Sequence, residues 1–232
     1  MKFQKVLLGI FLFLFAVAGR ANATERIFTY TYEPETMPQG GWEFENWVTA
    51  RRHNVWDFRQ ELEYGVTDNY LLSFYLNEKV DDGSEFEGIS LENKFLVLDP
   101  ATHPVGLALY LEPRFAAHET ELEEKIILGQ RSGDWKWALN LTHATEWKKE
   151  DGESETDGEL EVTFGLAKQV SKKWSIGAEL RDHNEIEGYK VWKHSSFFAG
   201  PAVNYKGGDW WVTVTALGGQ GVNVRCIVGI EF

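Results

Sequence analysis

The C-terminal stretch 210–232 constrains the fold most, because its residues alternate in character and it stops on an aromatic residue, Phe232. It reads WWVTVTALGGQGVNVRCIVGIEF, so two alternating runs flank a glycine-rich turn. A two-residue period of this kind predicts a β-hairpin. A final strand with an apolar face and no proline would leave a sheet edge open to pairing with other chains. Pairing of this strand with the first strand removes that edge, so the stretch predicts a closed β-barrel.

The first residues have the pattern of an export signal. Lys2 and Lys5 precede an apolar run at 6–19, and the small-x-small sequence Ala-Asn-Ala ends at Ala23. This pattern predicts a signal peptide over 1–23. No later run is apolar enough for a membrane helix, and the mean hydropathy of -0.34 argues against a bundle of such helices. A membrane β-barrel remains compatible with this hydropathy, because only alternate residues face the lipid.

Charge and cysteine content exclude other classes. The chain has 36 acidic and 23 basic residues, a net charge of -13. Removal of the leader, which holds three basic residues and no acidic ones, changes this charge to -16. Such a protein is not expected to bind nucleic acid, because phosphates require positive charge. Cys226 is the single cysteine, so no intramolecular disulfide can form, and its position in the alternation predicts an apolar wall residue.

Strand-like runs recur along the mature chain and number about twelve, an even number as single-chain bacterial barrels require. We expect them at 41–51, 55–65, 70–77, 88–98, 105–115, 122–130, 135–147, 159–167, 174–181, 195–205, 210–217 and 222–232, with the register of 122–130 least defined. The expected fold is an all-β, antiparallel, up-and-down transmembrane barrel over residues 41–232. A periplasmic segment over residues 24–40 is expected to precede it.

The joints and the aromatic residues support a membrane location. Mostly short joints at 66–69, 99–104, 131–134, 169–173 and 206–209 alternate with longer acidic ones at 78–87, 116–121, 148–158 and 182–194. This asymmetry is typical of periplasmic turns and extracellular loops. Aromatic residues flank both kinds of joint, as the two girdles of an outer-membrane barrel do: Tyr64, Tyr70, Trp135, Trp174, Tyr205, Trp210 and Phe232 on one side, and Trp56, Trp147 and Trp192 on the other. A soluble β-sandwich with a core of aromatic residues is the alternative.

One hairpin carries a family resemblance. The stretch 61–76, ELEYGVTDNYLLSFYL, resembles a hairpin of transporter-like outer-membrane barrels of the phenol-degradation MetA-pathway type. The segments 28–47 and 198–205, with their proline–glycine sequences, are also similar to that group. The resemblance implies a bacterial outer-membrane barrel with a transport role, and it supplies no catalytic residues.

The face opposite the lipid is expected to be strongly ionic. A charge facing lipid at mid-depth costs about 2–4 kcal/mol for Arg or Lys, so charged residues at alternate strand positions must line the lumen. The predicted lumen-lining residues are Glu43, Glu45, Asp57, Arg59, Glu61, Glu63, Glu92, Lys94, Glu112, Arg114, Glu179, Arg181 and Arg225.

Three interpretations of this lining stay open. Carboxylates outnumber the cationic side chains, so a water-filled lumen would form a weakly cation-preferring channel for small solutes. Pairing of the arginines with the glutamates would instead partly plug a structural, non-conducting barrel. A third possibility is a solvated lining that serves no dedicated substrate.

Enzymatic and metal-binding alternatives have weaker signals. His194 and Ser196 form an H-x-S pattern that would suit a barrel hydrolase acting on lipid, if a carboxylate oriented the histidine. The acidic stretch 148–159 lacks the ligand spacing of a calcium loop, and the remaining histidines have no metal-ligand spacing. The expectation is therefore a non-enzyme with no catalytic residues, metal or cofactor. Its partners would be outer-membrane lipid, the barrel-assembly machinery and an unidentified small solute.

Phe232 provides a test of the membrane interpretation. By resemblance to other outer-membrane barrels, it is part of the signal that the assembly machinery reads. Deletion of Phe232 should therefore lower the amount of folded protein in the outer membrane, while Phe232→Tyr, which keeps an aromatic end, should not. Quantitative immunoblots of outer-membrane fractions measure this, and unchanged levels after the deletion would contradict the assignment.

Overall fold

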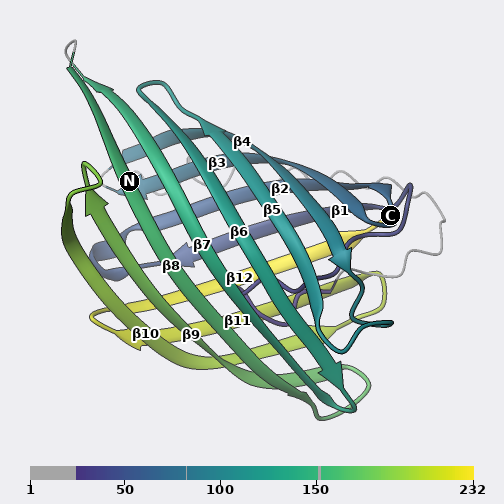
Figure 1. Cartoon of the computed structure of the whole chain (residues 1–232). Helices are drawn as coiled ribbons and strands as arrows, with labels where there is room; N and C mark the ends of the chain where they lie inside the picture. Colours follow the sequence, from purple (N-terminus) through teal and green to yellow (C-terminus); the bar gives the residue numbers. More distant parts are fainter. Residues whose placement is uncertain (1–24, 82, 151–152) are drawn as a thin grey trace, which may run out of the picture.

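The computed structural model describes residues 25–81, 83–150 and 153–232, and within them the chain forms a closed barrel of twelve antiparallel strands (Figure 1). The predicted signal peptide lies outside the described residues. The strands are β1 (Trp42–Ala50), β2 (Trp56–Thr67), β3 (Tyr70–Asp81), β4 (Gly83–Leu98), β5 (Gly106–Phe115), β6 (Glu119–Ser132), β7 (Trp135–Glu150), β8 (Glu153–Gln169), β9 (Trp174–Glu187), β10 (Val191–Lys206), β11 (Trp210–Gly219) and β12 (Val222–Glu231). A short 3-10 turn, η2 (Arg52–Asn54), joins β1 to β2. In the described residues, no helix has the length and apolar character needed to cross a membrane.

Closure occurs between the first and last strands, as the alternation predicts. β1 pairs antiparallel with β12 from Glu43 opposite Glu231 to Ala50 opposite Val224. Every other strand pairs with its neighbours in sequence, which gives the up-and-down order. The prediction of an all-β antiparallel barrel of about twelve strands is confirmed.

The two faces of the wall differ as the alternation requires. On β11, Trp211, Thr213, Thr215 and Leu217 point inward and are fully buried. Their neighbour Val214 is 39% exposed on the outer surface. Aromatic side chains pack in groups on the outside near the short-turn rim, where the rings of Trp42 and Tyr64, and of Trp174 and Tyr205, are in contact.

The loop-side strands are longer than the alternation indicates. β7 and β8 continue in register as far as Glu150 opposite Glu153, and β9 and β10 continue to Glu187 opposite Val191. The expected acidic loops at 78–87, 148–158 and 182–194 are therefore mostly paired strands. The hairpin of β7 and β8 projects beyond the rest of the barrel at the upper left of Figure 1. Acidic composition predicted loops here, but a hairpin whose two faces are both solvated needs no apolar alternation to pair.

The residues before β1 take a position that differs from the expected one. We expected 24–40 to precede the barrel as a periplasmic segment, whereas the structure places residues 26–34 inside the barrel, all of them buried. This segment forms no regular strand or helix, and it runs within the ring of strands, drawn in purple in Figure 1. The position is explained by hydrogen bonds with inward-facing polar residues of the wall.

Candidate functional site

The lumen is the candidate site, and its short-turn half is filled by residues 25–38, which we call the N-terminal segment. Glycines on the inner wall leave the space that this segment occupies. A Cβ atom added at Gly165 would lie 2.7 Å from the ring of Phe28, and one at Gly129 would lie 2.8 Å from Pro34. At Gly65 an added Cβ would lie 2.1 Å from the carbonyl oxygen of Pro38. Larger residues at these positions would collide with the segment.

Glu179 of β9 binds three successive backbone N–H groups of the segment. Its carboxylate accepts hydrogen bonds from the backbone N–H groups of Thr29 at 3.0 Å, Tyr30 at 2.9 Å and Thr31 at 2.8 Å. The hydroxyl of Thr215 also donates to it. A buried backbone N–H without a partner costs about 1–3 kcal/mol, so three such bonds to one charged acceptor fix this part of the segment firmly.

Two asparagines and an arginine bind the neighbouring residues. Asn140 of β7 accepts a hydrogen bond from the Tyr32 N–H at 2.6 Å and donates one to the Tyr32 carbonyl at 2.9 Å, as a strand neighbour would. Asn204 of β10 donates to the carbonyl of Arg26 at 3.1 Å. Arg225 of β12 donates to the carbonyl of Thr29 at 3.2 Å.

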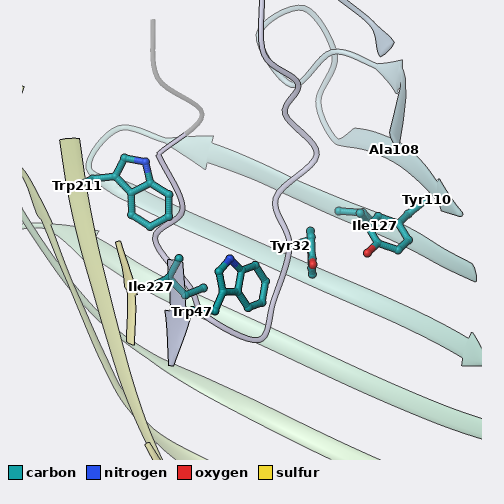
Figure 2. Close-up of a cluster of buried hydrophobic side chains, with 7 residues drawn as sticks. All are labelled: Tyr32, Trp47, Ala108, Tyr110, Ile127, Trp211 and Ile227. Carbon is teal, nitrogen blue, oxygen red and sulfur yellow. The ribbon is translucent and has the colours of Figure 1, made fainter. Parts of the chain in front are cut away.

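Aromatic rings and cationic groups pack around the segment above this layer. Tyr32 lies between Trp47 of β1 and Tyr110 of β5, with ring centroids 6.4 Å and 5.2 Å away (Figure 2). The guanidinium of Arg26 lies 3.9 Å from the Tyr32 ring centroid, and the ammonium of Lys125 lies 4.4 Å from it. Cation–π contacts of this kind strengthen when water is excluded, so they help to hold the segment.

Ion pairs anchor the end of the segment nearest the short turns. The ammonium of Lys136 lies 2.9 Å from the Glu35 carboxylate and 3.7 Å from that of Glu33. Burial raises the pKa of Glu33. Burial acts to raise the pKa of Glu35 as well, but Lys136 outweighs it and the pKa is lowered. Glu35 therefore carries the negative charge that Lys136 requires.

The loop-side half of the lumen is open and forms two adjoining hollows with volumes of about 950 and 640 Å³. We call them together the vestibule. Ion pairs cross its walls: Arg114 contacts Glu119 and, at 2.5 Å, Glu121, and Arg181 lies 2.6 Å from Glu161. Acidic residues outnumber basic ones in the lining of both hollows. The vestibule is therefore a polar chamber with an acidic surplus, and it leads to the N-terminal segment.

The structure places the predicted lumen-lining residues on the inner wall, where they differ in burial. Glu43, Glu45, Glu61, Glu63, Glu92, Glu112 and Glu179 are buried, while Asp57, Arg59, Lys94, Arg114, Arg181 and Arg225 are partly exposed. Arg59 pairs with Glu112 at 2.8 Å, as an Arg–Glu network across the lumen requires. Glu179 and Arg225 are brought together by the N-terminal segment rather than by a direct contact.

Sequence reasoning missed the inward aromatic residues and the role of the N-terminal segment. Trp47 and Tyr75 lie two positions from predicted or polar inward residues, so the same alternation places them in the lumen. The run TYTYEPE at 29–35 alternates as strongly as a strand does, which is unusual for a solvated linker. That alternation is the signal that could have indicated a buried segment.

Of the H-x-S pattern, the structure describes the side chain of Ser196. Ser196 is buried in the wall of the vestibule, and the register places it opposite His183. The ring of His183 contacts the carboxylates of Glu159 at 2.9 Å and Glu161 at 3.4 Å. The side chain of His194 lies outside the described part of the structure, so the predicted pair with Ser196 stays a prediction.

The closed twelve-stranded barrel with a polar interior has the fold of the porin-type outer-membrane proteins. The chain belongs to a family of unknown function, DUF6662, whose model matches residues 20–126 and 128–221. No curated protein matches the chain.

Solved structures of porins and channels share the fold. The chain is similar to the KdgM porin in complex with disordered oligogalacturonate, with a TM-score of 0.64 and 11% identity over 82% of this chain and 99% of that one. The COG4313 outer membrane channel from Pseudomonas putida F1 gives a TM-score of 0.62 and 11% identity over 88% and 100% of the two chains. The NanC porin gives a TM-score of 0.58 and 10% identity over 82% of this chain and 98% of that one. These likenesses show the fold, and the resemblance to the MetA-pathway group stays a prediction.

The hydrogen bonds to Glu179 lead to a prediction about how firmly the segment is held. In a Cys226→Ala background, a cysteine at Thr31 reports access of a hydrophilic thiol reagent to the buried segment. Glu179→Ala removes three charge-assisted bonds, each worth about 1.5–3 kcal/mol, so labelling should accelerate at least about tenfold. Glu179→Gln keeps one acceptor oxygen and should give an intermediate rate.

The retarded gel migration of boiled samples relative to unboiled ones controls for folding of each variant. Equal labelling rates in all three proteins would show that Glu179 does not hold the segment.

Proposed function

We propose that the protein is an outer-membrane channel for small solutes whose open path prefers cations and whose N-terminal segment closes the lumen. The observation that carries this proposal is a segment of chain that occupies the short-turn part of the lumen and whose backbone is hydrogen-bonded to Glu179, Asn140 and Asn204 of the wall. It has no covalent link to the wall other than its continuation into β1. Apolar contacts of Ile27 and Phe28 with alanines of the wall also hold the segment, whereas its hydrogen bonds can be exchanged for water.

The shape of the lumen supports a path for solutes. The vestibule is open on the loop side, and the N-terminal segment is the main material between it and the short-turn rim, where a cavity of only about 20 Å³ remains. Withdrawal of the segment would expose the inner faces of β7, β9 and β10. The solved structures of similar fold are porins and channels, which is consistent with this use of the barrel.

The charge of the lining supports the preference for cations. Buried glutamates of β1, β2, β4 and β5 surround the space beside the segment, and the vestibule also has more carboxylates than cationic groups. Low-dielectric walls focus the resulting field, and salt screens it over about 10 Å at 0.1 M. The identity of the solute does not follow from this pattern.

Planar-bilayer recording of a variant that lacks residues 25–37 tests the proposal. The wild type should conduct weakly or not at all, and the deletion variant should conduct with a reversal potential that indicates cation preference in a potassium chloride gradient. This preference should fall at high salt, because the field of the wall is then screened. A deletion variant that folds but does not conduct would support the non-conducting structural barrel.

The Arg59–Glu112 pair supplies matched variants for the sign of the selectivity. In the deletion background, Glu112→Gln removes a negative charge and should lower the cation preference, while Arg59→Gln removes its positive partner and should raise it. Both changes remove the same ion pair. A loss of structure would therefore shift the cation preference of the two variants in the same direction. Anion preference in the deletion variant without further substitutions would contradict the proposed cation preference.

A further inference from the structure

A group of inward-facing glutamates on β1 and β2 lies beside the N-terminal segment, and Arg26 of the segment contacts one of them, Glu45. The register of these strands places Glu43 opposite Glu63 and Glu45 opposite Glu61. Like charges directly opposite each other destabilise a sheet. All four residues are at most 7% exposed, so bulk water screens them little. Their negative charge therefore requires compensation from within the barrel.

The described residues supply only part of that compensation. The indole N–H of Trp47 donates to one oxygen of Glu45 at 2.6 Å, and the guanidinium of Arg26 lies 3.8 Å from the same oxygen. No described residue donates a hydrogen bond to either carboxylate oxygen of Glu61, or to the second oxygen of Glu45. Glu61 is fully buried. Arg26 attracts Glu61 as well as Glu45, but its single positive charge does not balance four buried carboxylates, which indicates a further positive group.

The geometry and chemistry of the cluster suit a metal ion. One carboxylate oxygen from each of Glu45, Glu61 and Glu63 lies within 4.8 Å of the other two. Calcium–oxygen bonds are about 2.3–2.6 Å long, so two oxygens bound to one ion lie at most about 5 Å apart. The three ligands are all hard oxygens, which favours Ca²⁺ or Mg²⁺ over transition metals. The small cavity beside Glu63, of about 20 Å³, has room for one water ligand.

We propose that Glu45, Glu61 and Glu63 bind a divalent cation inside the barrel, and that this cation is Ca²⁺. Ca²⁺ is favoured over Mg²⁺ because it accepts irregular ligand geometry and loses its water more readily. The ion neutralises the cross-strand pair of Glu45 and Glu61 and joins β1 to β2, next to the strand that closes the barrel. This role is structural and does not depend on whether the barrel conducts.

Terbium luminescence tests the site directly. Tb³⁺ replaces Ca²⁺ at oxygen-ligand sites, and the indole of Trp47, bonded to Glu45, is close enough to sensitise its emission. Purified full-length mature protein in detergent should bind a single Tb³⁺ with sensitised emission that Ca²⁺ displaces. Glu61→Gln keeps nearly the same side-chain shape but removes a charged ligand. The affinity of this variant for Tb³⁺ should therefore fall at least about tenfold, because substitution of residues that only contact a metal ligand already costs that much.

Glu121→Gln is the matched control, because it alters the acidic group Glu119, Glu121 and Glu146 in the vestibule, which contacts Arg114. This variant should bind Tb³⁺ at the cluster as the wild type does. Loss of the sensitised emission in Glu121→Gln but not in Glu61→Gln would assign binding to the vestibule and overturn the proposal.

Heat stability gives a second readout that does not need luminescence. The temperature at which the unboiled gel band is lost should rise for the wild type in Ca²⁺ relative to a chelator, and it should not change for Glu61→Gln. Absence of binding and of any Ca²⁺ effect in the wild type, together with a more stable Glu61→Gln, would show that shared protons neutralise the cluster. That result would overturn the proposal.

Discussion

The hydrogen bonds between the Glu179 carboxylate and three successive backbone N–H groups are the interaction on which the interior of this barrel depends. A strand satisfies its backbone by pairing with its neighbours, but a segment in the lumen has no such neighbour. Glu179 supplies the missing acceptor for Thr29, Tyr30 and Thr31, and Asn140 extends the same function to Tyr32. Without these acceptors, four buried backbone N–H groups would lose their partners, at a cost of about 1–3 kcal/mol each.

The polar inner wall thus has two roles, in two different parts of the lumen. Near the short turns, polar residues of the wall face the N-terminal segment and form hydrogen bonds with it. Toward the loops, the arginines and glutamates pair with one another along the vestibule, as Arg114 does with Glu119 and Glu121. The same composition therefore gives a closed half and an open half of a single lumen. Removal of the segment would turn the closed half into a lining that resembles the open one.

The alternation of residues predicted the wall of this barrel well, because each strand has one face toward the interior and one toward the outside. It identified the twelve strands and the β1–β12 closure. It failed beyond the wall, where the hairpin of β7 and β8 is solvated on both faces and has no apolar period. Acidic composition alone then indicated loops.

The role of Glu179 as an acceptor could not be predicted in the same way. Its partners lie about 150 positions earlier in the sequence, and their contact depends on a chain path through the lumen that no local pattern specifies. The alternating run at 29–35 indicated order, but it gave neither a location nor a partner. Long-range contacts of this kind form only in the assembled barrel. Only there can a charged residue of the wall accept hydrogen bonds from the backbone of the segment.

Hydrogen–deuterium exchange of the N-terminal segment tests the central claim most directly. The amides of Thr29, Tyr30, Thr31 and Tyr32 belong to no strand or helix, so they should exchange at the rate of an unstructured peptide if the segment lies outside the lumen. The structure predicts protection comparable with that of the amides of β9 and β11, measured by mass spectrometry on the folded protein in detergent. Exchange at the unstructured rate, in a sample whose strands are protected, would contradict the account.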